Sequence, residues 1–143
     1  MSAYLDASVL LPTLVLETSS PSVYAYLANE TQELLISDFA ATEVASGLSR
    51  LVRMRLLSAA DAVVRLEDFD TWRAGVSAPA DIHAADARLA YAYVRRFKLK
   101  LRAPDALHLA ITRRLDATLV TLDRRLADAG GVLGVAVIIP TAD

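Results

Sequence analysis

The chain contains 143 residues, of which 55% are hydrophobic and 22% are charged, and its formal net charge at pH 7 is -2. This length and apolar content predict one domain over residues 1–143 with a substantial core, and they exclude a disordered chain. The small negative charge excludes binding of nucleic acid through the overall field of the protein, so such binding would need local basic patches.

Cysteine is absent and only two histidines are present, which excludes disulfides and thiolate metal sites and disfavours a histidine-rich zinc site. No uninterrupted apolar run approaches the ~20 residues that a membrane-spanning helix needs. The N-terminal stretch MSAYLDASVL lacks a basic region and carries Asp6 within its apolar part, so we expect no signal peptide. Together these features predict a cytoplasmic protein.

Short apolar runs alternate with segments of helical periodicity along the whole chain. In the first half of the chain, the sequence predicts a strand over 3–5, a short irregular helix within 9–16, a helix that begins at Ser19 or Ser20, a strand over 34–36 and a helix from about 40 to 54. Next come a helix from 58 to about 69–71, a short strand near 76 and a helix from about 80 to 97. The last elements are a helix from 104, a strand over 119–122, a short helix over 124–129 and a strand over 135–139. Such alternation is typical of an α/β fold, in which a parallel sheet carries helices on both faces.

Local signals set several of these boundaries. Pro104 suits the first turn of a helix, where its missing N–H is not needed. Ser58 is a good N-cap, and Asp61 three residues later resembles the second half of a capping box. The pair Gly130 and Gly131 is expected to end the helix that begins at residue 124.

Four acidic residues are expected at the edge of the sheet where the parallel strands end. Asp6 ends the first strand, Glu43 lies in the first turn of the helix after the second strand, and Asp105 opens the helix before the strand that Asp123 ends. Sites in open α/β sheets form outside the carboxyl ends of the strands, so these four side chains are candidates for one catalytic and metal-binding site. The hydroxyls of Ser8 and Thr121, each two residues from one of these acids, are candidate supporting groups.

A cluster of carboxylates repels itself unless a cation neutralises it. Carboxylate oxygens, without cysteine and with few histidines, favour Mg²⁺ or Mn²⁺ as that cation. Such an ion can stabilise charge on a phosphodiester and activate water for an in-line attack. Each acid taken alone also has a structural interpretation, because an Asp at a strand end often forms a turn and an acid in a first helical turn often offsets the helix dipole.

The chain resembles PIN-domain ribonucleases, and in particular the VapC toxins of bacterial and archaeal toxin–antitoxin pairs. The resemblance covers nearly the whole chain and rests on the segments YLDASVL, SDFAATEVASGLSR, RAPDALHLAITRRL and ATLVTLD. It implies a PIN-like fold, in which a central, mainly parallel and twisted sheet of four to five short strands is flanked by helices on both faces.

The same resemblance implies an activity and its partners. The four acids fall on the acidic ligand positions of the family, and Ser8 and Thr121 match its frequent hydroxyl positions. The implied activity is a Mg²⁺- or Mn²⁺-dependent endoribonuclease that acts as the toxin of a toxin–antitoxin pair. A VapB-type antitoxin would block the site, and a homodimer of the toxin would assemble with it into a larger complex.

Other charged residues have weaker patterns. Exposed basic residues in the segment KLKLR and at the end of the helix over 40–54 are candidate phosphate contacts with RNA, namely Lys98, Lys100, Arg102 and Arg50. His108 lies three residues after Asp105, so it could tune the site, but a packed helical histidine is the commoner case. For Asp86, the sequence leaves open an approach to the site from the long helix.

Two other functions are compatible with parts of this pattern. The first is a catalytically silent PIN-like module that binds RNA or a protein partner. The second is a phosphatase or phospho-acceptor that uses Asp6, but the second aspartate that dehalogenase-like phosphatases place two residues later is Ser8 in this chain.

Overall fold

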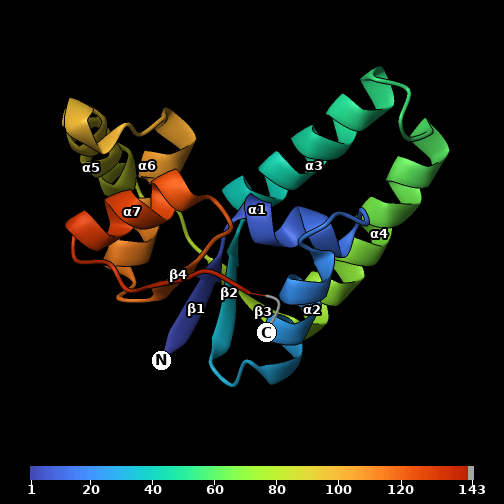
Figure 1. Ribbon diagram of the computed structural model, residues 1–143, viewed down its shortest axis with the longest axis horizontal. Helices are drawn as coiled ribbons and strands as arrows, with labels where there is room; N and C mark the ends of the chain where they lie inside the picture. The colour runs from blue at the N-terminus through green and yellow to red at the C-terminus, as the bar shows by residue number, and fades with distance from the viewer. Residues whose placement is uncertain (142–143) are drawn as a thin grey trace.

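A computed structural model describes residues 1–141 and shows five strands in one sheet (Figure 1). The strands are β1 (Ser2–Leu5), β2 (Glu33–Ser37), β3 (Ser77–Ala80), β4 (Thr118–Val120) and β5 (Val137–Ile138). Their order across the sheet is β3-β2-β1-β4-β5, and each neighbouring pair is parallel. The structure therefore confirms the α/β fold with a parallel sheet.

Helices connect the strands and cover both faces of the sheet (Figure 1). They are α1 (Ala7–Leu10), the 3-10 turn η1 (Leu11–Thr13), α2 (Ser20–Asn29), α3 (Asp38–Arg53), α4 (Ala59–Val76), α5 (Ala84–Val94), the 3-10 turn η2 (Phe97–Leu99), α6 (Ala103–Arg114) and α7 (Arg124–Val132). None of them, within residues 1–141, is long and apolar enough to cross a membrane.

The alternation of side chains along β1 divides the core into two parts. Tyr4 packs on the side of the sheet where α5, α6 and α7 lie, whereas Ala3 and Leu5 pack on the side of α1, α2, α3 and α4. All three side chains are fully buried. A strand that is buried on both faces needs a continuous apolar run, which explains why this segment lacks a polar alternation.

Several element boundaries differ from the sequence prediction. Helix α4 continues to Val76, so the third strand begins one residue later, at Ser77. Helix α5 is shorter than expected, and η2 forms separately after it. Helix α7 passes through Gly130 and Gly131 and ends at Val132, because Gly130 packs closely against Val137 and Leu109 rather than ending the helix.

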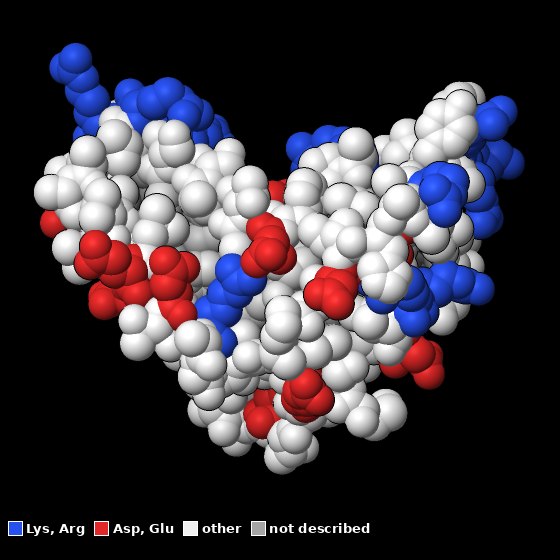
Figure 2. Space-filling model, turned by 180° about the vertical axis from the view of Figure 1, so that it is seen from behind, with Lys and Arg blue, Asp and Glu red and all other residues white. Residues whose placement is uncertain are grey.

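The long helices form two arms above the sheet. Figure 1 shows α3 and α4 as an antiparallel pair that rises on one side, while α5, α6 and α7 form the other side. Seen from behind, the surface is hollowed between the two arms, and blue basic side chains gather near the tips of both (Figure 2). The carboxyl ends of β1, β2 and β4 lie between the bases of the two arms (Figure 1).

Candidate metal centre

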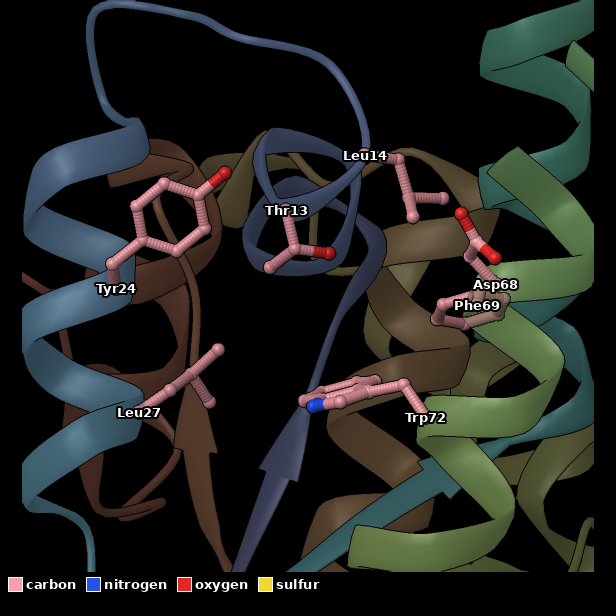
Figure 3. Close-up of a pocket in the computed structure, with 7 residues that line it drawn as sticks. All are labelled: Thr13, Leu14, Tyr24, Leu27, Asp68, Phe69 and Trp72. Carbon is pink, nitrogen blue, oxygen red and sulfur yellow. The ribbon is translucent and has the colours of Figure 1, made fainter. Parts of the chain in front are cut away.

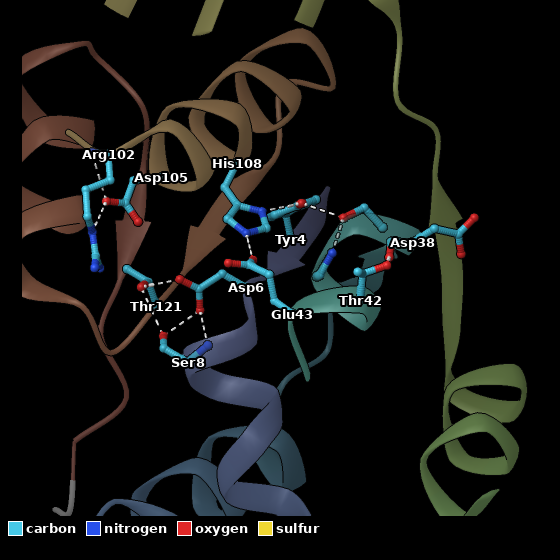
Figure 4. Close-up of polar contacts among 12 residues, drawn as sticks. Tyr4, Asp6, Ser8, Asp38, Thr42, Glu43, Arg102, Asp105, His108 and Thr121 are labelled. Carbon is cyan, nitrogen blue, oxygen red and sulfur yellow. Dashed lines mark hydrogen bonds and ion pairs between the residues drawn. The ribbon is translucent and has the colours of Figure 1, made fainter. Parts of the chain in front are cut away.

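Asp6 lies at the centre of the polar residues that follow the strands. It is the N-cap of α1, immediately after β1, and is only 4% exposed. The Ser8 hydroxyl donates to Asp6 Oδ1 at 2.5 Å and the Thr121 hydroxyl donates to Oδ2 at 2.6 Å. The backbone N–H of Ser8 also donates to Oδ1, at 3.1 Å. Both carboxylate oxygens are therefore held in fixed positions (Figure 4).

The electrostatic setting of Asp6 disfavours its charged form. Burial raises the pKa of the Asp6 carboxyl above its usual value, and the hydrogen bonds from Ser8 and Thr121 oppose that rise only in part. No Lys or Arg within residues 1–141 forms an ion pair with Asp6. A buried carboxylate without a cationic partner is a place where a bound cation would be stabilising.

Glu43 reaches the same region from the first turns of α3. Its Oε1 interacts with Nε2 of His108 on α6, and the His108 Nδ1 lies 2.7 Å from the hydroxyl of Tyr4. His108 is 2% exposed, whereas the Glu43 side chain is 30% exposed. Figure 4 shows the Glu43 side chain extending toward Asp6. The sequence-based view of His108 as a packed helical residue is correct, and the structure adds its contact with Glu43.

Asp105 lies at the N-terminus of α6, as the sequence predicts. It is 7% exposed, and its Oδ2 accepts the backbone N–H of Arg102 at 3.3 Å. The Arg102 guanidinium lies 3.6 Å from the same oxygen, but its own side chain is largely exposed. Because the Arg102 side chain is mostly in solvent, this ion pair contributes little to stability.

Asp123, the fourth candidate metal ligand, also caps the N-terminus of α7. It is the N-cap of α7, and its Oδ1 accepts the backbone N–H groups of Arg125 and Leu126 at 2.9 and 3.2 Å. Its own N–H donates to the Thr121 hydroxyl at 3.0 Å, which joins it indirectly to Asp6. The second carboxylate oxygen of Asp123 makes none of these contacts.

The candidate ligands are carboxylate oxygens, which are the atoms that a hard divalent cation such as Mg²⁺ prefers. Asp6, Glu43 and Asp105 supply carboxylate oxygens from the end of β1, from α3 and from α6. The Asp6 carboxylate is buried and forms no ion pair with a Lys or Arg among residues 1–141. Their side chains nevertheless do not enclose a finished cage, since no three His, Cys, Asp or Glu side chains among the described residues are close enough to hold one ion. In this arrangement Glu43 contacts His108 and Asp105 contacts Arg102.

Asp86 does not join the other acids. Its carboxylate forms a two-point ion pair with Arg114, at 2.8 and 3.0 Å, and accepts the backbone N–H of His83 at 2.8 Å. Burial alone would raise the pKa of Asp86, but the bonds from Arg114 and the His83 backbone hold it below its usual value. Through these contacts, Asp86 connects the start of α5 to the end of α6.

The four basic residues that were candidates for RNA contact are all exposed. Arg50 lies near the end of α3, whereas Lys98, Lys100 and Arg102 lie in and after η2, on the other arm. The two groups therefore lie on different arms of the molecule.

Sequence reasoning missed Tyr4 and Ser37. Both are fully buried, and their hydroxyls are 2.8 Å apart. Tyr4 looked like an ordinary core residue because it stands within an apolar strand, and Ser37 looked like the end of a strand. The signal available was weak: a Tyr buried inside a sheet usually needs a partner for its hydroxyl.

A separate apolar groove of about 350 Å³ lies between α2, η1 and α4 (Figure 3). Its lining includes none of the candidate site acids and consists of Thr13, Leu14, Tyr24, Leu27, Asp68, Phe69 and Trp72. Tyr24 is 49% exposed, so its ring is accessible from the groove side.

The model of the PIN domain family matches residues 3–132. The chain belongs to the PIN domain family. No curated protein matches the sequence, so the more detailed likeness comes from solved structures. Their sequence identities to this PIN domain are low, and the likeness therefore shows a shared fold.

Three solved structures illustrate that shared fold. FitAcB from Neisseria gonorrhoeae has a TM-score of 0.72 and 22% identity, and the match covers 96% of this chain and 97% of the other. VapBC2 from Rickettsia felis, bound to a DNA fragment from its promoter, has a TM-score of 0.72 and 15% identity, with coverages of 97% and 98%. VapC20 from Mycobacterium tuberculosis, a toxin that cleaves the sarcin-ricin loop, has a TM-score of 0.71 and 17% identity, with coverages of 90% and 95%.

Proposed function

We propose that this PIN domain is a Mg²⁺- or Mn²⁺-dependent endoribonuclease that acts as the toxin of a toxin–antitoxin pair in the cytoplasm. The observation that carries the proposal is the buried Asp6 carboxylate, which accepts from two hydroxyls but forms no ion pair with a Lys or Arg in the described part of the chain. The similarity to VapC20, a toxin that cleaves RNA, supports the choice of substrate class.

The residues of this chain have distinct roles in the proposal. Asp6, Glu43, Asp105 and Asp123 would hold the cation, while Ser8 and Thr121 fix the orientation of Asp6. A divalent cation supplies positive charge that stabilises the phosphodiester during attack and makes a water molecule a better nucleophile. Arg50, Lys98, Lys100 and Arg102 would contact the phosphates of RNA on either side.

The nuclease assay uses purified protein, end-labelled RNA and a titration of Mg²⁺ or Mn²⁺, with EDTA as the blank. We expect cleavage by the wild type with either metal, and a loss of at least ~100-fold in Asp6→Asn and Asp105→Asn. Asp128→Asn is the matched control, because Asp128 is an exposed acid on α7 away from the candidate site. Expression of the wild type, but not of the two site variants, should arrest growth.

A second function has one observation in its favour. The carboxylates of Glu43, Asp105 and Asp123 already have partners within the protein, and the described residues form no finished metal cage. A module that binds RNA or a protein without cleaving it needs no metal, so its carboxylates can have partners within the protein. RNA that stays intact at all metal concentrations, while still bound by the protein, would favour this second function.

The apolar groove between α2, η1 and α4 supports an antitoxin as the protein partner. An amphipathic helix could insert apolar side chains between Tyr24 and Trp72, which face the groove from opposite helices (Figure 3). A toxin–antitoxin complex from Klebsiella pneumoniae, with a TM-score of 0.67 and 20% identity to this chain, supports the same partner class. The proposed assembly is a homodimer of this chain, enlarged by the antitoxin.

The partner is tested with the small protein encoded by the neighbouring reading frame. Co-expression should suppress growth arrest, and light scattering should show a dimer alone and a larger complex with the partner. Trp72→Ala should weaken the complex, whereas Asp70→Ala, an exposed residue on the same helix, should not. A toxin that the neighbouring protein neither binds nor suppresses would contradict the antitoxin proposal.

A further inference from the structure

A chain of buried hydrogen bonds leads from the start of α3 to Glu43. The Ser37 hydroxyl lies 2.8 Å from the Tyr4 hydroxyl, which lies 2.7 Å from Nδ1 of His108, and Nε2 of His108 contacts Glu43 Oε1 (Figure 4). Tyr4, Ser37 and His108 are at most 2% exposed. The chain joins β1, β2, α6 and α3, which are four separate elements of the fold.

The backbone contact of Ser37 favours one direction for this chain of hydrogen bonds. The Ser37 oxygen accepts the N–H of Ala40 at 3.0 Å as the N-cap of α3, and its own hydrogen can point to the Tyr4 oxygen. A Tyr4 oxygen that accepts from Ser37 has its own hydrogen available for His108 Nδ1. An imidazole that accepts at Nδ1 carries its hydrogen at Nε2, which faces Glu43.

We propose that His108 is a positioning residue that holds Glu43 Oε1 and leaves Oε2 for a divalent cation, with Tyr4 and Ser37 selecting the Nε2–H tautomer. This inference rests on the proposed function, because it takes Glu43 as a ligand of the cation. A glutamate has three rotatable side-chain bonds, and ordering it at the moment of binding costs entropy. A hydrogen bond that orders the carboxylate beforehand removes that cost.

Packing around His108 makes it a rigid donor. Its ring centroid lies 5.6 Å from that of Tyr4 and 5.2 Å from that of Phe39. The imidazole therefore has aromatic neighbours, and its two nitrogen atoms have one partner each. In metal sites of known proteins, residues that orient a ligand in this way change metal affinity about 10–100-fold when they are replaced.

The first measurement is the affinity of the whole protein for Mn²⁺, by calorimetry. His108→Leu should weaken binding about 10–100-fold. His108→Gln should stay within a few-fold of the wild type, because a glutamine amide can place an N–H donor near the position of Nε2. A purely structural role for His108 predicts a different result, in which thermal stability falls in both variants and Mn²⁺ affinity is equal to that of the wild type.

The second measurement reports the tautomer and does not depend on His108 replacement. Nitrogen NMR of the wild type should show the His108 ring in the Nε2–H form. Tyr4→Phe removes the donor to Nδ1 but keeps the ring in the core, so the His108 signals should move away from that form and Mn²⁺ affinity should fall. If His108→Leu does not fold, this variant still decides the question.

The outcomes separate this inference from the proposed function. Normal Mn²⁺ binding and RNA cleavage by the wild type, together with unchanged affinity in His108→Leu or Tyr4→Phe, would overturn the positioning role alone. An Nδ1–H tautomer in the wild type would also overturn it. A wild type that binds no Mn²⁺ would overturn the proposed function and, with it, the positioning role of His108.

Discussion

The hydroxyl of Thr121 donates a 2.6 Å hydrogen bond to Oδ2 of Asp6, across 115 residues of sequence. This contact joins the end of β4 to the end of β1, which are neighbouring strands. Thr121 is fully buried, and its oxygen also accepts the N–H of Asp123. One hydroxyl therefore connects two of the candidate ligands.

Thr121→Val is expected to destabilise the protein, because the valine keeps the shape but leaves Asp6 Oδ2 and the Asp123 N–H without this partner. The loss should be about 1–3 kcal/mol of unfolding free energy, measured by urea denaturation. Thr121→Ser is the matched control, since it keeps the hydroxyl and removes one methyl group. Equal losses in the two variants would contradict a role for the hydrogen bonds.

Asp6→Asn should stabilise the metal-free protein at neutral pH while it abolishes the proposed activity. The folded state raises the pKa of Asp6, so it holds that proton more tightly than the unfolded state does. Stability from this group is present below the ordinary aspartate pKa and falls as the pH rises through the raised value. The neutral amide avoids this cost of a buried charge, so the variant should have the higher melting temperature at neutral pH.

Thermal unfolding of wild type and Asp6→Asn over a range of pH checks this prediction. The difference between them should be small in acid and should grow, in favour of the variant, toward neutral pH. Adding Mn²⁺ should raise the melting temperature of the wild type and narrow the difference, since a ligand that binds only the folded state stabilises it. A wild type that is more stable than the variant at neutral pH without metal would contradict the prediction.

Arg114→Met is expected to cost about 3–5 kcal/mol, because it leaves the Asp86 carboxylate, 2% exposed, without its charged partner. The double variant with Asp86→Asn should recover part of this loss. The pKa of Asp86 is lowered in the folded protein, so the stability it contributes is present above the ordinary aspartate pKa and is lost as the pH falls through the lowered value. Denaturation curves at neutral and acidic pH measure both effects, and a fully additive double variant would argue against the pair.

The two adjacent glycines of α7 should respond in opposite ways to alanine. A Cβ at Gly130 would lie 2.8 Å from Cγ2 of Val137, whereas a Cβ at Gly131 would meet nothing within 4 Å. Gly131→Ala should therefore gain up to about 1 kcal/mol from helix propensity. Gly130→Ala should lose about 1–3 kcal/mol through overpacking, as thermal unfolding would reveal. A stabilising Gly130→Ala would show that α7 can shift away from β5.

Much of the architecture follows from sequence patterns. The apolar runs at residues 3–5 and 34–36 are strands, and the acids that follow them lie at one edge of the sheet because parallel strands all end there. The segment from Pro104 to Leu122 forms the expected helix and strand. These features are local, so periodicity and capping signals were sufficient to predict them.

Features that depend on distant contacts were harder to predict. Gly130 and Gly131 look like a helix end, but Gly130 packs against β5 and α6, and α7 continues through both glycines. The partner of His108, Glu43, is 65 residues away, and the partner of Asp86 is 28 residues away. No spacing rule links such pairs, because their proximity results from the order of strands in the sheet.

The adjacency of β1 and β4 has a consequence for synthesis of the chain. A ribosome releases the protein from its N-terminus, so Asp6 emerges long before Asp105 and Thr121. A nascent chain that stops before Ala103 contains Asp6 and Glu43 but neither α6 nor β4. The polar centre therefore assembles only when translation is almost complete, and an abandoned translation product lacks half of the candidate ligands.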